Sequence, residues 1–439
     1  MINLKEEFKK EMKDILKDEY DSFIESYNLS SFKGLRLNQL KIQNEALLPF
    51  ELESIPWCDT GYYYKDIDQP GKHIFHEMGL YYIQEPSAMA VVEELDIKEG
   101  DYVLDMCAAP GGKSTQIGAK LNGTGLLISN EIIPSRAKIL SSNIERMGIK
   151  NAIVLNETPK NIAKHFKGFF NKILVDAPCS GEGMFRKNPD AINEWSVENV
   201  EMCAERQLEI LNEAAKCCAD TARIVFSTCT FSNKENESVV EKFLFEHPDF
   251  YLVQSKYKFE NGLDKDGLTQ RIYPHKVKGE GHFFAILQRS IASNIQKEIA
   301  LKPLKQNPDF SKWVKDNLNI DIQYNLTFGD NLYLAPYTKL DGLKVERPGL
   351  HLGVLKKNRF EPSHSLALAI KKEDVKRIID LKADSKYAQD VINGLTIPTD
   401  IVGWGLICVE GLPLAWFKGD GNQAKNHYPK GLRKEVNID

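Results

Sequence analysis

Two cysteines and an aspartate stand where apolar runs of the sequence end in loops. Asp176 and Cys179 follow residues 172–175 in the segment Asp-Ala-Pro-Cys-Ser-Gly, and Cys229 follows residues 222–226 in Ser-Thr-Cys-Thr. Short apolar runs that end in such loops are typical of buried strands. Because ligands bind beyond the carboxyl ends of strands in an open parallel sheet, both thiols can reach one pocket. An ionised thiol there could attack a substrate and hold it covalently.

A glycine-rich turn is the second chemical feature. The apolar residues 101–105 lead into Met-Cys-Ala-Ala-Pro-Gly-Gly-Lys-Ser, residues 106–114, and then into a helical stretch. Backbone N–H groups and the helix dipole at such a turn can receive a ligand. Glu131 ends the next apolar run, 125–131, and lies 19 residues after Gly112. At this spacing a Rossmann-type fold places an acid on the hydroxyls of a ribose.

The elements that must position these residues alternate between strand and helix. The series is completed by apolar runs at 151–155 and 281–287, a crossover helix at 134–147 and a long amphipathic helix between Trp195 and Ala219. A capping box from Ser232 to Glu235 is expected to start one more helix, which Pro248 ends. Alternation of this kind predicts parallel pairing through right-handed crossovers, with 281–287 as an antiparallel edge. We therefore predict an α/β fold with a doubly wound, Rossmann-like sheet.

The residues before this sheet predict a small α+β accessory region. Residues 1–27 have apolar positions at helical spacing, which indicates a helix pair packed on the body. Residues 34–41 are typical of a strand with basic side chains on one face. Tyrosines gathered between 62 and 82 could stack on unpaired bases, although clustered tyrosines are more often buried.

The residues after the sheet predict a linker and then a region of short strands. Within that region we expect a helix near 371–381 and a hairpin at 403–418. The end of the chain gathers basic side chains beside Trp404 and Trp416, as an RNA-binding surface requires, although a solvated tail would have the same charge. The basic residues are Lys418, Lys425, His427, Lys430, Arg433 and Lys434.

The composition of the 439 residues is that of a globular protein, with 42% hydrophobic and 27% charged residues. No apolar run approaches the roughly 20 residues that cross a bilayer, and the charged N-terminus has no signal-peptide core. We therefore expect a cytoplasmic protein without membrane contact.

The eight cysteines include no C-x-x-C pair, so no metal site is expected. With a net charge of −5, any nucleic-acid surface must be a local cluster of basic residues.

Three segments, in this order and spacing, resemble the motifs of a known family. Residues 105–113 (Asp-Met-Cys-Ala-Ala-Pro-Gly-Gly-Lys), 176–183 (Asp-Ala-Pro-Cys-Ser-Gly-Glu-Gly) and 227–230 (Ser-Thr-Cys-Thr) look like those of the Nop/Sun family of S-adenosylmethionine-dependent RNA cytosine-5 methyltransferases. The resemblance covers roughly residues 30–290. Residues 425–433 are similar to the end of the PUA-like domain of the RsmF-like ribosomal RNA branch, which favours RNA binding for the basic tail.

The resemblance implies a division of the chain. The expected parts are an N-terminal RNA-binding or accessory region over 1–90, a class I methyltransferase catalytic domain over 91–290, a linker over 291–308 and a β-rich, PUA-like RNA-binding region over 309–439. The protein is expected to be a monomer that binds RNA, with ribosomal RNA of the small subunit (16S) as the first choice. Truncation after about residue 300 should then leave cofactor binding intact and weaken RNA affinity.

The resemblance also implies a role for each site residue. Cys229 would attack C6 of the cytosine, Asp176 would contact the base near N3, and Cys179 would promote the elimination that releases the product. Lys113 would supply positive charge near the pocket, and Glu131 would bind the ribose of S-adenosylmethionine. The remaining cofactor contacts are expected from Cys107, Ala108, Ala109, Pro110, Gly111, Gly112, Lys113 and Asp176.

The chain departs from the family pattern after the third strand, where a further acid usually contacts the adenine side. Thr158 stands at that place, and Asn156 or Glu157 could take over the contact.

Methylation of transfer RNA and a non-catalytic RNA-binding assembly role stay open as alternatives. A DNA cytosine methyltransferase would normally use the cysteine of the Pro-Cys loop as its nucleophile. A nucleoside triphosphatase is disfavoured, because a phosphate-binding loop ending at Gly112-Lys113-Ser114 needs glycine at position 107.

Overall fold

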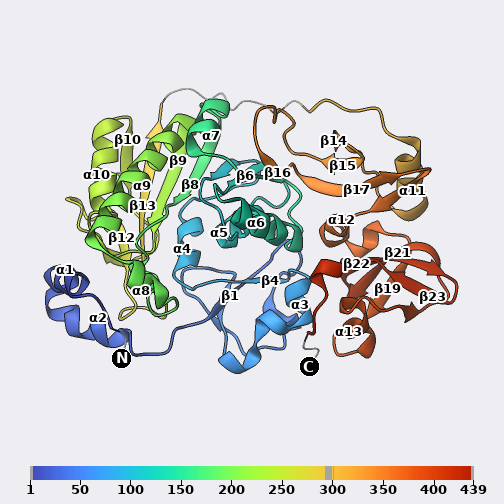
Figure 1. Cartoon of the computed structure of the whole chain (residues 1–439), viewed down its shortest axis with the longest axis horizontal. Coiled ribbons are helices and arrows are strands. Elements are labelled where there is room, and N and C mark those ends of the chain that lie inside the picture. Colours follow the sequence, from blue (N-terminus) through green and yellow to red (C-terminus); the bar gives the residue numbers. More distant parts are fainter. Residues whose placement is uncertain (1–2, 292–298, 300, 437–439) are drawn as a thin grey trace.

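The computed structural model describes residues 3–291, 299 and 301–436, and a ten-stranded mixed sheet lies at the centre of this part of the chain (Figure 1). Five neighbouring strands run parallel, in the order β9 (Cys218–Thr228), β8 (Phe170–Asp176), β5 (Tyr102–Asp105), β6 (Leu126–Asn130) and β7 (Ala152–Leu155). Strand β13 (His282–Ser290) joins β9 antiparallel. Beyond it lie β12 (Gln270–Ile272), β11 (Glu260–Asn261) and β10 (Phe250–Val253). The predicted doubly wound, Rossmann-like sheet with an antiparallel β13 is confirmed.

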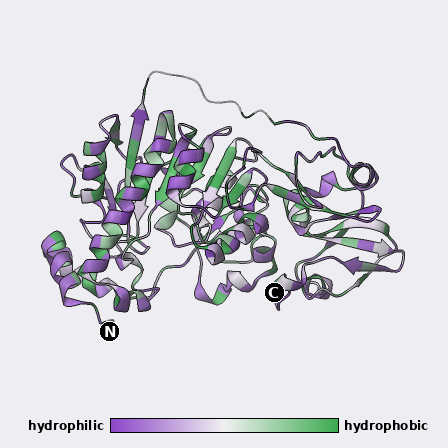
Figure 2. Cartoon of the chain, turned by 45° about the horizontal axis from the view of Figure 1, so that its top comes forward, coloured by the Kyte–Doolittle hydropathy of each residue, from purple (hydrophilic) through white to green (hydrophobic). Residues whose placement is uncertain are grey.

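Both faces of the parallel strands are apolar, because successive side chains point to opposite sides. Leu104 and Ile224 are buried on one face, and Val103 and Val225 on the other. The first face is covered by α7 (Pro159–His165), α9 (Val197–Cys217) and α10 (Glu237–Glu246), and the second by α4 (Ala88–Glu93), α5 (Gly112–Lys120) and α6 (Pro134–Arg146). Figure 2 shows these strands as a hydrophobic layer between more polar helices. The carboxyl ends of the strands are thus left to the loops that bear the candidate residues.

Two N-terminal helices pack beside those loops. In α1 (Glu6–Leu16) and α2 (Tyr20–Ser26), Phe8 and Phe23 are fully buried. The ring of Phe8 lies 5.5 Å from that of Phe185, and the ring of Phe23 lies 5.1 Å from that of Phe231. The predicted helix pair therefore exists, and it supports the segments that follow Cys179 and Cys229.

A small sheet with the order β2-β3-β1-β4 follows these helices. Its strands are β1 (Gly34–Leu37), β2 (Glu53–Ser54), β3 (Gly61–Tyr63) and β4 (Tyr81–Ile83). The expected basic face at 34–41 is not exposed. Arg36 is buried and donates to Gly112 O and Thr115 Oγ1, and Lys41 donates to two backbone carbonyls. These cations hold the small sheet against α5 and α6, and the tyrosines Tyr63, Tyr81 and Tyr82 are buried in the core.

The predicted helix before Pro248 exists as α10, but its predicted start is wrong, and the predicted helix near 371–381 does not form. The capping box does not form, because α10 begins only at Glu237 and the Glu235 carboxylate is bonded to Ser180 and Gln207 instead. Residues 371–381 form a short 3₁₀ turn, Lys372–Asp374, and strand β19 (Ile378–Leu381). Ile378 and Ile379 pair in parallel with strand β21 (Val402–Val409), and this pairing outweighs the local helical pattern.

The C-terminal residues form two further sheets, drawn in orange and red at the right of Figure 1. One contains β14 (Leu326–Phe328), β15 (Asn331–Leu334), β17 (Leu350–Lys356) and β18 (Arg359–Pro362); the other contains β19, β20 (Ile397–Pro398), β21 (Val402–Val409), β22 (Leu412–Asp420) and β23 (Gln423–Asn426). They are flanked by α11 (Pro308–Asn317), α12 (His364–Ala369) and α13 (Lys386–Ile392). Strands β21 and β22 form the predicted hairpin. Eight of the eighteen residues of the predicted linker, 292–298 and 300, lie outside the described residues.

One strand of this region leaves it and joins the central sheet. Strand β16 (Val345–Arg347) pairs antiparallel with β7 at the sheet's far edge. Arg347 bonds Glu145 of α6 at 3.1 Å and the Ser365 hydroxyl at 2.6 Å. Residues from both sides of position 300 therefore build one sheet.

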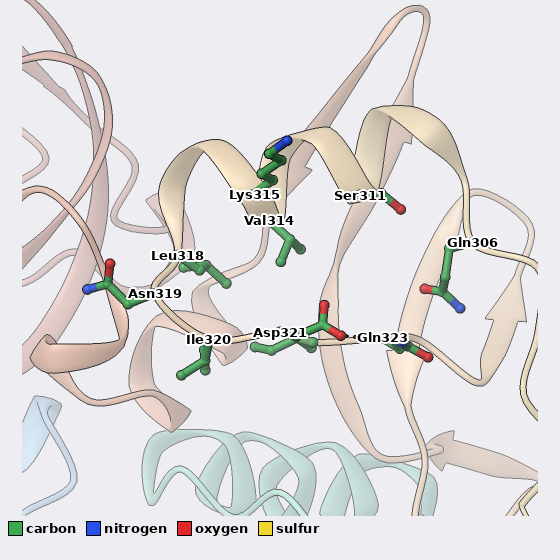
Figure 3. A pocket seen from close by; sticks show the side chains of 10 residues that line it. Gln306, Ser311, Val314, Lys315, Leu318, Asn319, Ile320, Asp321 and Gln323 are labelled. Atoms are coloured by element: carbon green, nitrogen blue, oxygen red, sulfur yellow. Dashed lines mark hydrogen bonds between the residues drawn. The ribbon is translucent and has the colours of Figure 1, made fainter.

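A pocket of about 320 Å³ beside α11 lies away from the candidate loops (Figure 3). Its lining is mostly apolar and amide side chains, with Lys315 and Asp321 as the charged groups. It contains none of the side chains singled out in the sequence.

Within the described residues, no helix combines the length and apolar content that a membrane span requires.

Candidate active site

The two cysteines and Asp176 meet at the carboxyl edge of the sheet. Because β8 and β9 are parallel neighbours with Asp176 opposite Ser227, their following loops lie side by side. The Sγ atoms of Cys179 and Cys229 are 3.2 Å apart, and the Cys229 N–H donates to Cys179 Sγ at 3.3 Å. Both cysteines are partly accessible, whereas Cys203, Cys217, Cys218 and Cys408 are buried. Sequence spacing alone thus located a real thiol pair.

Asp176 is held as a carboxylate. Its Oδ2 lies 2.8 Å from Lys113 Nζ, and its Oδ1 accepts a hydrogen bond of 2.7 Å from the Ser227 hydroxyl. Burial alone would raise the pKa of Asp176, but Lys113 and the nearby His282 outweigh it and hold this pKa well below its usual range. Burial likewise opposes the charge of Lys113, but Asp176 raises the pKa of that ammonium. At neutral pH the site therefore contains an ion pair, in which Asp176 accepts hydrogen bonds and does not donate them.

Two buried carboxylates that the sequence analysis did not assign to the site support the two loops. Glu235 accepts hydrogen bonds from the Ser180 N–H at 3.0 Å, from the Ser180 hydroxyl and from Gln207 Nε2 at 2.8 Å. Glu182 accepts from Trp195 Nε1 and from the Phe231 N–H, both at 2.8 Å. Burial raises the pKa of Glu182 to about 7. Glu182 lies inside a segment quoted for the motifs and Glu235 lies five residues after another, but only the fold reveals that they support the loops of Cys179 and Cys229.

Removal of the Glu235 carboxylate should weaken this support. We expect Glu235→Ala to lower the free energy of unfolding by about 1–3 kcal/mol, since it leaves the Ser180 N–H without its acceptor and Gln207 Nε2 with Pro178 O alone. Chemical denaturation followed by circular dichroism measures this change. Glu241→Ala, on the exposed side of α10, is the matched control and should stay within about 0.5 kcal/mol of the unsubstituted protein. Equal stability of the two variants would contradict the bracing role.

The glycine turn lies beside this edge and is fixed at several points. Gly111 has a φ of +118°, a conformation that favours glycine, and α5 begins directly after it. The Ala108 N–H donates to Asn130 O at 2.8 Å, and Asn143 donates to Pro110 O at 2.8 Å. The buried Asp105 accepts from the Ser114 hydroxyl at 2.7 Å, and burial raises its pKa to about 7. The turn is therefore a rigid wall.

A cavity of about 1020 Å³ extends from Glu131 to the thiol pair. Cys107, Ala109, Asp176, Cys179 and Cys229 line one end. At the other end, the buried Glu131 accepts a hydrogen bond of 2.9 Å from the Ile133 N–H and lies 3.4 Å from Arg136. Ile132 and Ile133 are exposed there, and their apolar side chains can pack against the face of a planar ligand. The cavity has the volume for a nucleoside cofactor, and the Glu131 carboxylate can accept hydrogen bonds from its ribose hydroxyls.

Of the three candidates for the adenine contact, Thr158 is the one that lines this cavity. Its side chain also caps α7 by accepting from the Asn161 N–H. Asn156 donates to the backbone carbonyls of Glu131 and Ile132, and Glu157 is buried and accepts from the Lys344 N–H at 2.8 Å. Asn156 and Glu157 therefore shape the cavity wall from behind.

A second cavity, of about 380 Å³, shares its wall with the first. Both are lined by Cys107, Ala109, Asp176, Ala177 and Cys229. The smaller one is also lined by Ala108, Pro110, Gly112, Lys113, Gln84 and His282. Two ligands, one in each cavity, would meet beside the Cys229 thiol.

Among the described residues no cluster of three or more His, Cys, Asp or Glu side chains is arranged to hold a metal ion.

Family models match the chain almost from end to end. The model described as "16S rRNA methyltransferase RsmB/F" matches residues 92–288. Three others describe parts of RsmF: its N-terminal domain matches residues 4–86, its first C-terminal domain residues 309–370, and its PUA domain residues 381–434.

Individual proteins agree with these matches. The ribosomal RNA small subunit methyltransferase F of Vibrio vulnificus (strain YJ016) is 31% identical over 100% of this chain and 99% of its own length. That of Shewanella sp. (strain MR-7) is 29% identical over 94% of each chain. A methyltransferase homologue from Pyrococcus horikoshii has a TM-score of 0.59 at 25% identity, covering 66% of this chain and 96% of its own. NSun6 from the same organism, solved with SFG, shares the fold with a TM-score of 0.57 at 21% identity, covering 65% and 98%.

Proposed function

The chain belongs to the RsmF family of 16S ribosomal RNA methyltransferases, and from this premise we propose that it methylates C5 of a cytosine in small-subunit ribosomal RNA through a covalent bond from Cys229. S-adenosylmethionine is its methyl donor and ribosomal RNA its substrate. The observation that carries the proposal is the position of Cys229 in the wall between two adjoining cavities. A cofactor in the larger cavity and a base in the smaller one would both reach that thiol.

The chemistry requires a nucleophile of this kind. C5 of cytosine reacts poorly with an electrophile until a thiolate adds to C6, which forms an S–C6 bond and turns the ring into an enamine with electron density at C5. When bound, S-adenosylmethionine supplies the electrophilic methyl group. After transfer, a base removes the C5 proton, the double bond re-forms, and the S–C6 bond breaks with its electron pair returning to Cys229. The target base must leave its stack to reach the thiol, so an unpaired or flipped cytosine is expected.

The ion pair beside Cys229 suits a cytosine. The Asp176 carboxylate can accept from the exocyclic N4 amino group, which uracil lacks. Lys113, 2.8 Å from Asp176, fixes that carboxylate and supplies positive charge to the pocket. This refines the expected contact near N3, because an ionised Asp176 has no proton to offer to N3 itself.

Glu131 is proposed to bind the ribose of the cofactor, while residues 107–113 hold its methionine end. We expect Glu131→Ala to weaken S-adenosylmethionine binding by about 10- to 100-fold, since hydrogen bonds to a charged acceptor contribute about 1.5–3 kcal/mol. Isothermal titration calorimetry with the cofactor measures the change. Glu209→Ala removes an exposed acid from the opposite wall of the same cavity and is expected to change binding less than about twofold. Equal losses in both variants would mean that net charge, and not a ribose contact, governs affinity.

The C-terminal residues are proposed to form part of the RNA surface. Lys418 lies 6.0 Å from the centre of the Trp404 ring, and the His427 ring lies 4.5 Å from it. Two other residues of the expected RNA surface stabilise the fold instead: Trp416 is buried, and Lys434 forms an ion pair with Glu77 at 2.7 Å. A monomer in the cytoplasm remains our expectation for the state of the protein.

The product nucleoside tests the proposal. The protein is incubated with S-adenosylmethionine and, separately, with small-subunit ribosomal RNA and with transfer RNA, and the digested RNA is analysed by mass spectrometry. We expect 5-methylcytidine from the ribosomal RNA alone, at a position that bisulfite sequencing then identifies. A different methylated nucleoside would refute the cytosine-5 chemistry, and methylation of transfer RNA alone would refute the ribosomal target.

A further inference from the structure

We propose that His282 is a base-binding residue that donates a hydrogen bond to N3 of the target cytosine and so selects cytosine over uracil. The inference rests on the proposed function and adds to it a group that lies outside the three segments 105–113, 176–183 and 227–230. It starts from an unusual feature of this side chain. His282 is 4% exposed, and neither of its ring nitrogens has a hydrogen-bond partner among the described residues.

The position of His282 directs it to the substrate cavity. It is the first residue of β13, and in the β13–β9 ladder Phe283 is opposite Thr228, so His282 comes beside Cys229. Its side chain lines the smaller cavity together with Cys229, Asp176 and Lys113. His282 Nε2 lies 3.8 Å from Asp176 Oδ1, too far for a hydrogen bond.

An unpaired polar group at such a place is costly unless a ligand pairs with it. A buried donor or acceptor without a partner costs about 1–3 kcal/mol, and most such groups in folded proteins are paired. His73, the other buried histidine among the described residues, accepts a hydrogen bond from the Phe75 N–H at 3.2 Å. Because neither ring nitrogen of His282 makes a hydrogen bond within the described residues, we infer that its partner is a ligand that enters the cavity.

The charges around the cavity identify that partner. The Watson–Crick edge of cytosine presents a donor, the N4 amino group, next to an acceptor, N3. Asp176 accepts and His282 can donate, and their side chains are neighbours, so the pair matches this edge in order. Uracil presents an oxygen and an N–H at these places and would set its O4 against the Asp176 carboxylate. Because Asp176 is ionised, His282 also supplies the hydrogen bond that eases thiolate addition at C6.

The test combines His282 variants with a substrate that lacks N3. Methylation is measured on the ribosomal RNA target and on the same RNA carrying 3-deazacytidine at the modified position. His282→Ala should lower kcat on cytidine RNA by about 100-fold, as the loss of one donor to a developing charge does, and leave the Kd for S-adenosylmethionine unchanged. On 3-deazacytidine RNA, His282→Ala and the unsubstituted protein should react at the same reduced rate. His282→Gln, which keeps an N–H donor, should recover at least about tenfold of the loss on cytidine RNA.

The outcomes separate this inference from the proposed function. If the unsubstituted protein makes 5-methylcytidine but His282→Ala is equally active, the inference is wrong. It is also wrong if His282→Ala causes the same loss on 3-deazacytidine RNA, because the lost contact is then not to N3. His275→Ala is the matched control: His275 contacts Glu19 and does not line the cavity, so activity should stay within about twofold. Failure of the unsubstituted protein to make 5-methylcytidine refutes the proposed function itself.

Discussion

Replacement of Cys229 with alanine should abolish methyl transfer to RNA. We expect turnover to fall by at least about 10⁴-fold, because without the thiolate C5 of the cytosine never becomes nucleophilic, and losses of this order follow removal of other enzymatic nucleophiles. Transfer of radioactive methyl from labelled S-adenosylmethionine to RNA measures the rate. Affinity for the cofactor should be retained, since Glu131 and the turn at 107–113 are untouched.

Cys203→Ala is the control for the loss of a thiol. Cys203 is buried in α9 and bonds to Asn199 of the same helix, so its removal should affect stability slightly and turnover less than about twofold. Cys229→Ala activity at the original rate would show that the nucleophile lies elsewhere. A covalent RNA adduct that persists in Cys229→Ala but disappears in Cys179→Ala would assign the nucleophile to the Pro-Cys loop.

Replacement of Cys179 should have a different result: a covalent protein–RNA species should accumulate. The Sγ of Cys179 lies 3.2 Å from that of Cys229, and its contact with Cys229, together with burial, holds the pKa of Cys179 well above its usual range. Cys179 therefore keeps its proton at neutral pH and can donate it towards the Cys229 thiolate as the S–C6 bond breaks. Without this help the last step slows, and Cys179→Ala should run as a shifted band on a denaturing gel.

Two further variants test this account of Cys179. Cys179→Ser keeps an O–H donor beside Cys229 and should show less of the shifted band than Cys179→Ala. The double variant lacking both thiols should show none, since no nucleophile remains. Normal turnover of Cys179→Ala without any adduct would remove Cys179 from the release step.

The strands of the parallel sheet and the edge that bears the site could be predicted from the sequence because they depend on local patterns. Apolar runs that end in Asp176 and Ser227 mark buried strands, and parallel strands share one ligand-binding edge. The same patterns misled where a long-range contact dominates. Glu235 fits a capping box, but a better use of its carboxylate exists at Ser180 and Gln207, 55 and 28 residues away. Arg36 has the pattern of a surface cation in the sequence, because its acceptors on α5 lie 76 and 79 residues away.

Other site features leave no trace in the sequence. His282 stands within an ordinary strand pattern, and its importance arises from the register between β13 and β9. Nor does any local signal indicate that residues 345–347 belong to the central sheet. Their partner, β7, is nearly 200 residues earlier in the chain. Such pairings are decided by packing in three dimensions and not by neighbouring residues.

The addition of β16 to β7 changes how the protein can be divided. A chain cut near residue 300 would lose the strand that closes this side of the sheet, along with the Lys344 N–H that pairs with Glu157 behind the cofactor cavity. The bared row of backbone groups on β7 would then be a template for another copy, so the fragment would tend to aggregate. The parts of the chain before and after residue 300 are thus not independent modules, so truncation there is expected to disturb the cofactor cavity as well, and an insertion or deletion between them must preserve the reach of the chain back to β7.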